Sequence, residues 1–431
     1  MRYTSTILCF ALQAVAYPFA VEELAKRQVP STALARSLSK ARSNCGNIPC
    51  LVFDEEAQRV STSGDHAWAA PQPGQIRGPC PGLNAAANHG YLSRSGVTTL
   101  LESIEGLGAA FGMGPGLAGF LAAYAVIMNG DILLTSWSIG GPPPSDQLTK
   151  GLLGQAQGIS YAHNTYESDM SVARCDAYIN NGDAHSLDLA RFKMLYETGM
   201  QNDRYTLDGL AQDYLAKGKM SVSENPYFFS APFSGVLVAP AAYLFVINLM
   251  SNHTHEEPSG YLDGKTLKQF FAVEGEYPNF KWNPGHERIP DNWYRRTLSN
   301  PYDIPQADSD VAIQYAAYPE SLRLGGNTAG VNTYMGVDLG NLTGGVLTAE
   351  NLFNPNNPKG ACFYAQLVQS LIPDSGSVLV KSLTGITNLL NDHILSVIGG
   401  MDCPTVDKFD QSLFNDFPGY KYSPTGMAQT Y

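Results

Sequence analysis

The sequence has little charge. Only 15% of its 431 residues are Asp, Glu, Lys or Arg, whereas an average soluble domain has about 25%. The formal net charge is −12, and Lys and Arg nowhere form a run. A nucleic-acid surface needs clustered cations, so we expect no nucleic-acid partner. With 44% hydrophobic residues, the chain is long and apolar enough to bury a large core.

The sequence also lacks an apolar segment suited to crossing a membrane. Residues 107–128 are uncharged but contain Pro115 and several glycines, which are poor residues for the middle of a helix. Residues 236–250 are too few, because a membrane-spanning helix needs about 20 apolar residues. We therefore expect both segments to be buried helices and the protein to have no membrane partner.

The first residues are typical of a secretory signal. Arg2 precedes an apolar run over 7–15, and the small residues at 14–16 suit cleavage by a signal peptidase. Lys26 and Arg27 form a dibasic pair where a secretory-pathway protease would trim a short pro-segment. Residues 1–27 are thus predicted to be removed and the protein to be secreted. The N-x-[ST] sequons at Asn252 and Asn341 fit glycosylation on this route.

Paired C-x-x-C motifs of the zinc type are absent from the sequence. Of its seven cysteines, Cys9 lies in the predicted signal. Six remain, namely Cys45, Cys50, Cys80, Cys175, Cys362 and Cys403. Secretion permits disulfides, but spacing alone leaves the pairing open. A local Cys45–Cys50 bridge is one candidate.

Alternation of apolar and polar residues, typical of strands, is scarce, and 132–137 is its best example. Apolar residues recur instead at helical spacing in four segments, at 97–104, 187–196, 207–215 and 379–394. The sequence therefore predicts a mainly α fold, a single helical domain with long loops and very little β structure.

Cys80 lies between Pro79 and Pro81, so its backbone is constrained on both sides. A helix is predicted to start at Gly82-Leu83-Asn84. Free N–H groups at a helix N-terminus stabilise a thiolate and lower its pKa. From these residues alone, a reactive thiolate and a disulfide partner on a turn are equally plausible.

The residues around Cys80 resemble the proximal loop of the fungal haem-thiolate peroxidases, the family of chloroperoxidase and the unspecific peroxygenases. The resemblance is carried by His66-Ala67-Trp68, Ala70-Pro71, residues 77–84 and residues 87–92. It implies that Cys80 is the axial thiolate ligand of haem b, a ligand that favours O–O cleavage. It covers 65–418, leaving an N-terminal arm over 28–64 and a tail over 419–431.

A second segment, 163–176, resembles the E-x-D-x-S-x-x-R-x-D helix of this family, which in long members binds Mg²⁺ beside a haem propionate. Carried over, the Glu167 carboxylate, the Ser168 carbonyl and the Ser171 hydroxyl would be ligands. Such hard oxygen ligands suit Mg²⁺. Without the resemblance, a polar helix start with acidic residues explains the segment. The resemblance also implies a Cys362–Cys403 disulfide and leaves Cys175 as a buried free thiol.

The acid–base pair of this family is not found in its usual place. Long members carry an Arg and, seven residues later, a Glu after N-P-x-F. Here these positions fall on Phe233 or Ser234 and on Pro240 or Ala241, and 225–255 contains no Asp, Glu, Lys or Arg. Other sources of a proton donor remain open. They are water, Ser230, Ser234, His253, His255, Glu256 and Glu257.

The same segment is expected to line an apolar chamber for a hydrophobic substrate, through Phe228, Phe229, Phe233, Val236, Leu237 and Val238. Core packing would explain these residues equally well. The sequence thus predicts a secreted haem-thiolate oxidoreductase that uses a peroxide on an apolar or aromatic substrate. The alternatives are a non-catalytic haem-binding protein and an atypical oxidase of a polyketide pathway, whose members this chain is similar to at 287–294.

Two other enzyme classes are disfavoured. A serine hydrolase would need G-x-S-x-G, and the nearest segment, 158–162, lacks the second glycine. A dinucleotide site would need a strand before its glycines, but 100–105 has the pattern of a helix.

Overall fold

The computed structural model describes residues 32–46, 50–144, 156–347, 406, 409–420 and 422. The predicted signal peptide, the helix expected at 379–394 and the Cys362–Cys403 pair lie outside these residues. Cys45 and Cys50 form a disulfide, so the local bridge that was one candidate pairing is confirmed.

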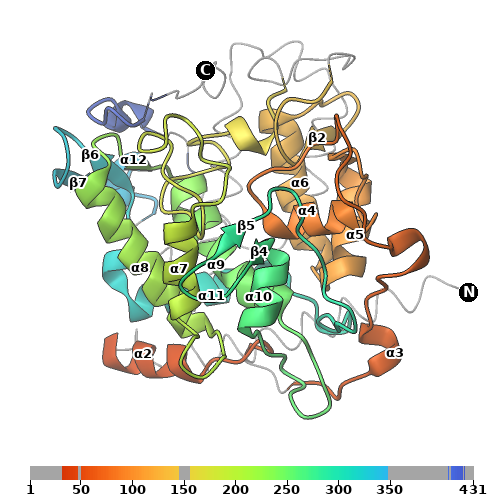
Figure 1. The fold of residues 1–431 in the computed structure, drawn as a ribbon. Coiled ribbons are helices and arrows are strands. Elements are labelled where there is room, and N and C mark those ends of the chain that lie inside the picture. Colours follow the sequence, from red (N-terminus) through yellow and green to blue (C-terminus); the bar gives the residue numbers. More distant parts are fainter. Residues whose placement is uncertain are drawn as a thin grey trace, which may run out of the picture.

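The described chain is mainly helical, as predicted (Figure 1). Its helices are α2 Thr32–Ala41, α3 Glu55–Gln58, α4 Pro81–Asn88, α5 Leu100–Phe111, α6 Pro115–Asn129, α7 Leu189–Glu197, α8 Leu207–Glu224, α9 Ala239–Met250, α10 Gly264–Phe270, α11 Ile304–Ala317 and α12 Leu339–Leu342. A π-helical turn, η3 Ser234–Val238, leads into α9, and a short 3₁₀ turn, η4 Pro319–Ser321, follows α11.

The strands are short and form three small antiparallel sheets. They are β1 Val97–Thr99 with β2 Ser136–Ser138, β4 Val273–Glu274 with β5 Lys281–Trp282, and β3 Phe229–Ser230 with β6 Gly325–Asn327 and β7 Tyr334–Gly336.

Figure 1 shows α4, α5 and α6 together on one side and α7, α8, α9 and α11 on the other. Helix α5 packs on α6, α8 and α11 pack on α9, and α2 of the N-terminal arm packs on α11. One continuous apolar core joins α4 to α9 and α11, whereas Ala35 of α2 packs in a separate small cluster with residues of α8 and α11. Most residues of α6 and α9 are buried, as expected for 107–128 and 236–250. Among the described helices, none is long and apolar enough to cross a membrane.

Two local predictions are wrong at their boundaries. The apolar pattern at 97–104 is not one helix, because Val97–Thr99 pairs with β2 and α5 begins at Leu100. A capping box sets this start: Thr99 accepts a hydrogen bond from the Glu102 N–H and donates its own to the Glu102 carboxylate. The strand expected at 132–137 covers only 136–138, because the Asp131 carboxylate accepts the Leu134 N–H in a turn.

Candidate functional site

Cys80 is the N-cap residue of α4, which begins at Pro81 as the sequence predicted. The backbone N–H groups of Gly82 and Leu83 point at its sulfur. Burial raises the pKa of the Cys80 thiol, and these two N–H groups and Arg174 oppose the rise without reversing it. The expected lowering of this pKa by the helix terminus is therefore outweighed by desolvation. Cys80 and the buried Cys175 are both free thiols, so the structure does not pair Cys80 with another described cysteine.

Asn84 holds the loop before Cys80 in place. Its side-chain oxygen accepts the Gly78 N–H at 2.9 Å, and its amide donates to the Gly78 carbonyl at 2.9 Å. Gly78 lies against the chain at Ile139, where an added Cβ would come within 1.9 Å of the carbonyl oxygen. The Asn84 amide also donates to the buried Glu287 carboxylate at 3.0 Å. The thiol is thus presented by a backbone with little freedom to move.

A buried arginine lies behind the thiol. Arg174 donates through Nε to the Pro79 carbonyl at 2.9 Å, and its guanidinium lies over the Trp282 ring. Its two terminal nitrogens are buried without a hydrogen-bond partner in the described part of the chain. Burial lowers the pKa of Arg174, while the nearby Glu287 and Cys80 raise it. Arg174 therefore supplies a positive charge close to the sulfur.

The segment predicted to bind Mg²⁺ is not a helix. Residues 162–188 form turns, bends and isolated bridges, including a bridge between His163 and Glu167. The prediction of a helix is wrong because backbone N–H groups of this segment donate to side-chain carboxylates and not to the backbone carbonyls of a helix. Met170 and Ala177, for example, donate their N–H groups to the carboxylates of Asp176 and Asp169.

Glu167 is tied to His163, whose Nδ1 lies 2.7 Å from Glu167 Oε2. Burial lowers the pKa of His163, but the Glu167 carboxylate outweighs it and raises the pKa to about 9. The other carboxylate oxygen of Glu167 and the hydroxyl of Ser168 are buried without a partner among the described groups. The residues described contain no cluster of three or more His, Cys, Asp and Glu side chains suited to a metal. A cation here would rely on one carboxylate with hydroxyl and carbonyl oxygens.

Asn225 connects this loop to the segment that follows α8. Its amide donates to Asp169 and to Asp176, at 3.1 Å each. Burial and the neighbouring Asp176 raise the pKa of Asp169 well above its ordinary value. Arg191, at 2.7 Å, pairs with Asp176. Asn225, the first residue of the N-P-x-F segment, thus fixes the position of the loop that is predicted to bind Mg²⁺.

Phe233 begins the turn that leads into α9 and lies among aromatic rings from other elements. Its ring centroid is 3.8 Å from that of Tyr124 and 6.4 Å from that of Tyr166. Tyr166 in turn lies close to the thiol, since burial and then the Cys80 charge raise the pKa of its phenol. The apolar segment 233–238 therefore approaches the neighbourhood of Cys80.

Two of the residues predicted to line an apolar chamber are core residues in the structure. Phe228 and Phe229 are completely buried. Phe229 packs against Phe414 and Phe417, and Phe228 packs against Tyr334. Both rings therefore belong to the core: Phe229 lies on β3, which pairs with β6, and Phe228 directly precedes that strand. Leu237 and Val238 remain half-buried.

Among the alternative proton donors, His253, His255 and Glu257 already make other contacts. His253 lies under Gly260 and its Nδ1 contacts the Pro258 carbonyl at 2.9 Å. Burial lowers the pKa of His253 to about 4. The exposed His255 packs against Phe53. Glu257 pairs with Arg204 at the surface, and Glu256 is exposed. The hydroxyls of Ser230 and Ser234 are buried without a partner in the described ranges.

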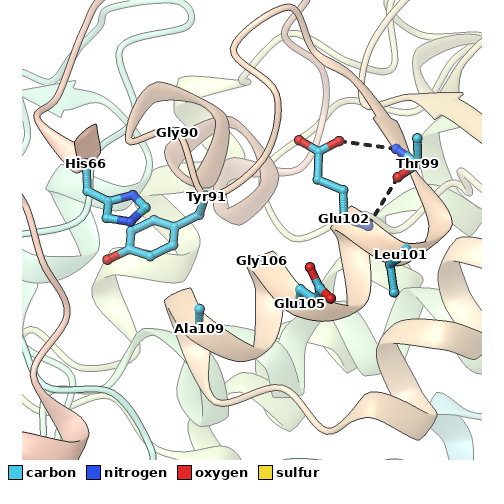
Figure 2. A pocket seen from close by; sticks show the side chains of 9 residues that line it. All are labelled: His66, Gly90, Tyr91, Thr99, Leu101, Glu102, Glu105, Gly106 and Ala109. Carbon is cyan, nitrogen blue, oxygen red and sulfur yellow. Dashed lines mark hydrogen bonds between the residues drawn. The ribbon is translucent and has the colours of Figure 1, made fainter.

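A surface pocket lies beside α5, away from the predicted ligands (Figure 2). The rings of His66 and Tyr91 stack at 3.9 Å on one side, and Glu102 and Glu105 lie on the other. The Glu102 carboxylate is already occupied by the Thr99 capping box. Cys80, Glu167 and Ser171 are not among its lining residues.

The mainly helical fold and the free thiol of Cys80 at the start of α4 agree with the resemblance to the haem-thiolate peroxidases. Residues 66–298 match the family described as peroxidase, family 2. The chain belongs to this family and is an enzyme of the peroxidase type. The resemblance to fungal haem-thiolate peroxidases is confirmed at the level of the family.

Three relatives show how far the similarity extends. The chain is 37% identical to a dothistromin biosynthesis peroxidase of Dothistroma septosporum, over 97% of this chain and 98% of the relative. It is 33% identical to an aromatic peroxidase of Fusarium equiseti, over 98% of each. It is 26% identical to an aromatic peroxygenase of Cyclocybe aegerita, over 76% of this chain and 81% of the relative.

Sequence reasoning placed Cys80 and the loop of Glu167 but missed the groups that support them. Arg174 belongs to the motif, yet its bond to the Pro79 carbonyl connects residues 95 positions apart. Glu287 and Asn84 meet across 203 positions. Neither contact follows from local spacing, although Glu287 is a charged residue in a charge-poor chain and could have been examined for that reason.

Proposed function

We propose that this protein is a secreted haem-thiolate oxidoreductase in which a peroxide oxidises or oxygenates an apolar or aromatic substrate. The observation that carries the proposal is the free, half-buried thiol of Cys80 at the N-terminus of α4, fixed by Asn84 and backed by Arg174. Its donor chemistry fits haem iron, because thiolate is a soft ligand that donates electron density.

The residues around Cys80 suit a thiolate-bound haem by their charge as well as by their donor atom. A haem ligand at this sulfur would be a thiolate, and the N–H groups of Gly82 and Leu83 and the cation of Arg174 favour that anion. The unpartnered terminal nitrogens of Arg174 also suit a carboxylate such as a propionate. When bound, a thiolate haem supplies cleavage of the peroxide O–O bond.

We also propose a Mg²⁺ site at Glu167, Ser168 and Ser171, beside a propionate of the haem. The buried and unpartnered Glu167 Oε1 supports it, because a carboxylate oxygen without a partner in the interior is costly. His163 contacts the other oxygen of Glu167, so the cation and His163 would share one carboxylate.

The substrate is proposed to be aromatic because two relatives are named aromatic peroxidase and aromatic peroxygenase. The relative named for dothistromin biosynthesis supports a place in the formation of a secondary product. The alternatives are a non-catalytic haem-binding protein and an atypical polyketide-pathway oxidase. The absence of Asp, Glu, Lys and Arg from 225–255 favours both, and the similarity at 287–294 favours the second.

Secretion with glycosylation at Asn252 and Asn341 completes the proposal. Asn341 is exposed at the C-terminal end of the described domain. Asn252 is half-buried and accepts the Tyr294 N–H through its side-chain oxygen. Glycosylation of Asn341 therefore requires less rearrangement. Mass spectrometry of the secreted protein before and after glycosidase treatment tests both positions.

The function is tested by giving the purified haem-loaded protein hydrogen peroxide and a series of aromatic substrates across a range of pH. Oxygenated or radical-coupled products that require both peroxide and haem are expected. If the protein binds haem but yields no product at any pH, it is a haem-binding protein and the oxidoreductase proposal fails.

A further inference from the structure

A groove lies on the surface between the C-terminal end of α8 and the hairpin of β6 and β7, which Figure 1 shows beside that helix. Two contacts hold the hairpin there. The Asn332 backbone N–H donates to the Val222 carbonyl at 2.8 Å, and the Asn327 side-chain amide donates to the same carbonyl at 2.9 Å. The groove has a volume of about 620 Å³, which is within the range of sites for small molecules.

Arg323 is the buried cation that lines this groove. It lies two residues before β6 and keeps only 6% of its surface accessible. Its guanidinium lies against α8, where a Cβ added at Gly218 would come within 2.4 Å of Arg323 Nη1. Gly218 is one helical turn before Val222, so the two residues share a face of α8. The absence of a side chain at Gly218 thus leaves the space that the guanidinium fills beside the groove.

No group in the described part of the chain neutralises Arg323. Its Nη1 is buried without a hydrogen-bond partner, and the ion pairs between described residues do not include it. Two phenols lie close by, but burial raises the pKa of both Tyr214 and Tyr334 to about 12, although the Arg323 charge opposes the rise. Their hydroxyls donate to the carbonyls of Gly235 and Leu324. Both phenols are therefore neutral and are not counterions.

A buried arginine without a counterion is costly. Its guanidinium is not deprotonated in proteins, so burial removes hydration from a charge that persists. The structure pairs two other buried cations with carboxylates: Arg191 lies 2.7 Å from Asp176, and Lys217 lies 2.5 Å from Asp213. An anion bound in the groove would supply the partner that Arg323 lacks.

The accessible part of the groove also favours an anion. Lys219 on α8 adds a second positive charge, and Glu224 is the one carboxylate among the described lining residues. Two cations and one carboxylate make the groove positive, in a chain whose net charge is −12. Met220, Val222 and the Tyr334 ring lie beside these charges. The lining therefore suits an anion that is carried on an apolar or aromatic body.

We propose that this groove binds an organic carboxylate. The planar fork of the Arg323 guanidinium matches the two oxygens of such a ligand, and its apolar part packs on Met220 and Tyr334. A phosphate ion would satisfy the guanidinium but would leave the apolar side chains without a contact. Cys80 and Glu167 are not among the lining residues, so this binding does not depend on the proposed function.

The test is titration calorimetry of the full-length, haem-loaded protein with three probes. They are benzoate, its neutral analogue benzamide, and inorganic phosphate. Benzoate should bind saturably, more weakly as the salt concentration rises, and without changing the absorption spectrum of the haem. Benzamide and phosphate should bind at least about tenfold more weakly. Arg323→Met should weaken benzoate binding by about 10–100-fold, as expected for the loss of hydrogen bonds to a charged group.

Three further variants test the charge of the groove. Lys219→Gln should weaken benzoate binding by about two- to fivefold, the effect of an exposed ion pair. Glu224→Gln should strengthen the binding, because it removes a negative charge from the lining. Lys265→Gln removes an exposed lysine from α10. It is the matched control for Lys219→Gln and should bind benzoate like the wild type.

Thermal unfolding gives a second readout that does not depend on calorimetry. Saturating benzoate should raise the unfolding midpoint of the wild type, because the folded state alone binds it, and should leave that of Arg323→Met unchanged. Without any anion, Arg323→Met should be at least as stable as the wild type, because it removes an unpaired buried charge. Glu224→Gln should also keep the stability of the wild type.

The outcomes decide the proposal. It is overturned if the wild type does not bind benzoate, or if Arg323→Met binds it equally well. Benzamide that binds as tightly as benzoate, or phosphate that binds more tightly, would contradict the assignment to an organic carboxylate. A marked loss of stability in Arg323→Met and in Glu224→Gln would show that Arg323 is already paired with Glu224, which also overturns it. The failure of peroxide turnover would refute the proposed function and leave the benzoate result intact.

Discussion

The guanidinium Nε of Arg174 donates a hydrogen bond of 2.9 Å to the carbonyl of Pro79, the residue directly before Cys80. This bond joins the two sequence motifs that define the site. It also places a buried positive charge beside the sulfur, where it opposes the effect of desolvation on the thiol. The position of the thiol is thus set by a residue from a distant loop as well as by its own helix.

Arg174→Lys should therefore disturb the site although it keeps the charge. Lysine lacks the Nε–H and the planar group that lies over Trp282. We expect a loss of about 1.5–3 kcal/mol in the free energy of unfolding, as for a hydrogen bond to a charged group, together with weaker retention of haem. Denaturant unfolding and haem titration measure both. Arg288→Lys, which alters a more exposed guanidinium over Trp68, is the control, and equal effects of the two substitutions would contradict this role.

Glu167→Gln should remove the proposed Mg²⁺ site. A neutral amide is a weaker ligand than a carboxylate for a hard divalent cation. After extensive chelation, elemental analysis should find Mg²⁺ retained by the wild type and lost from Glu167→Gln. The exposed Glu105→Gln should behave like the wild type. Equal Mg²⁺ content in all three proteins would reject the site.

Replacement of Asp308 should change stability in a defined pH window. The folded protein keeps Asp308 protonated up to about pH 7, whereas the unfolded chain does so only below about pH 4. Because the folded state binds more protons between these values, the free energy of unfolding of the wild type falls as pH rises through the window.

Asp308→Asn lacks this loss. It should match the wild type below about pH 4 and become more stable above about pH 7, by up to about 4 kcal/mol at about 1.4 kcal/mol per pKa unit. Denaturant unfolding at a series of pH values measures the difference. A difference that does not vary with pH would show that Asp308 is ordinarily solvated.

A buried ion pair on α8 contacts the loop that carries Glu167 and Arg174. Lys217 Nζ lies 2.5 Å from Asp213 Oδ2 and donates to the Val172 carbonyl at 2.6 Å. Desolvation lowers the pKa of Lys217 to about 8 and raises that of Asp213, although each partner opposes the shift of the other. Asp213→Asn should cost about 3–5 kcal/mol, because it leaves a buried charge unpaired.

The apolar double variant Asp213→Leu with Lys217→Met should recover most of this loss, since a buried pair contributes little net stability relative to apolar residues of similar size. Denaturant unfolding of the single and double variants measures the recovery. A double variant less stable than Asp213→Asn would contradict this balance.

The sequence predicted those helices whose positions depend on neighbouring residues alone. The prolines around Cys80 fixed the start of α4, and apolar spacing located α7, α8 and the buried α9. It failed at 163–176, where carboxylates and amides bind distant backbone groups in place of a helical ladder.

The central claim is that Cys80 binds haem iron as a thiolate, and the absorption spectrum of the reduced carbon-monoxide complex tests it most directly. Wild type and Cys175→Ala, which changes the other free thiol, should both give the red-shifted Soret band of a thiolate-ligated haem. Cys80→Ala should lose that band. A thiolate-type band retained in Cys80→Ala would contradict the account.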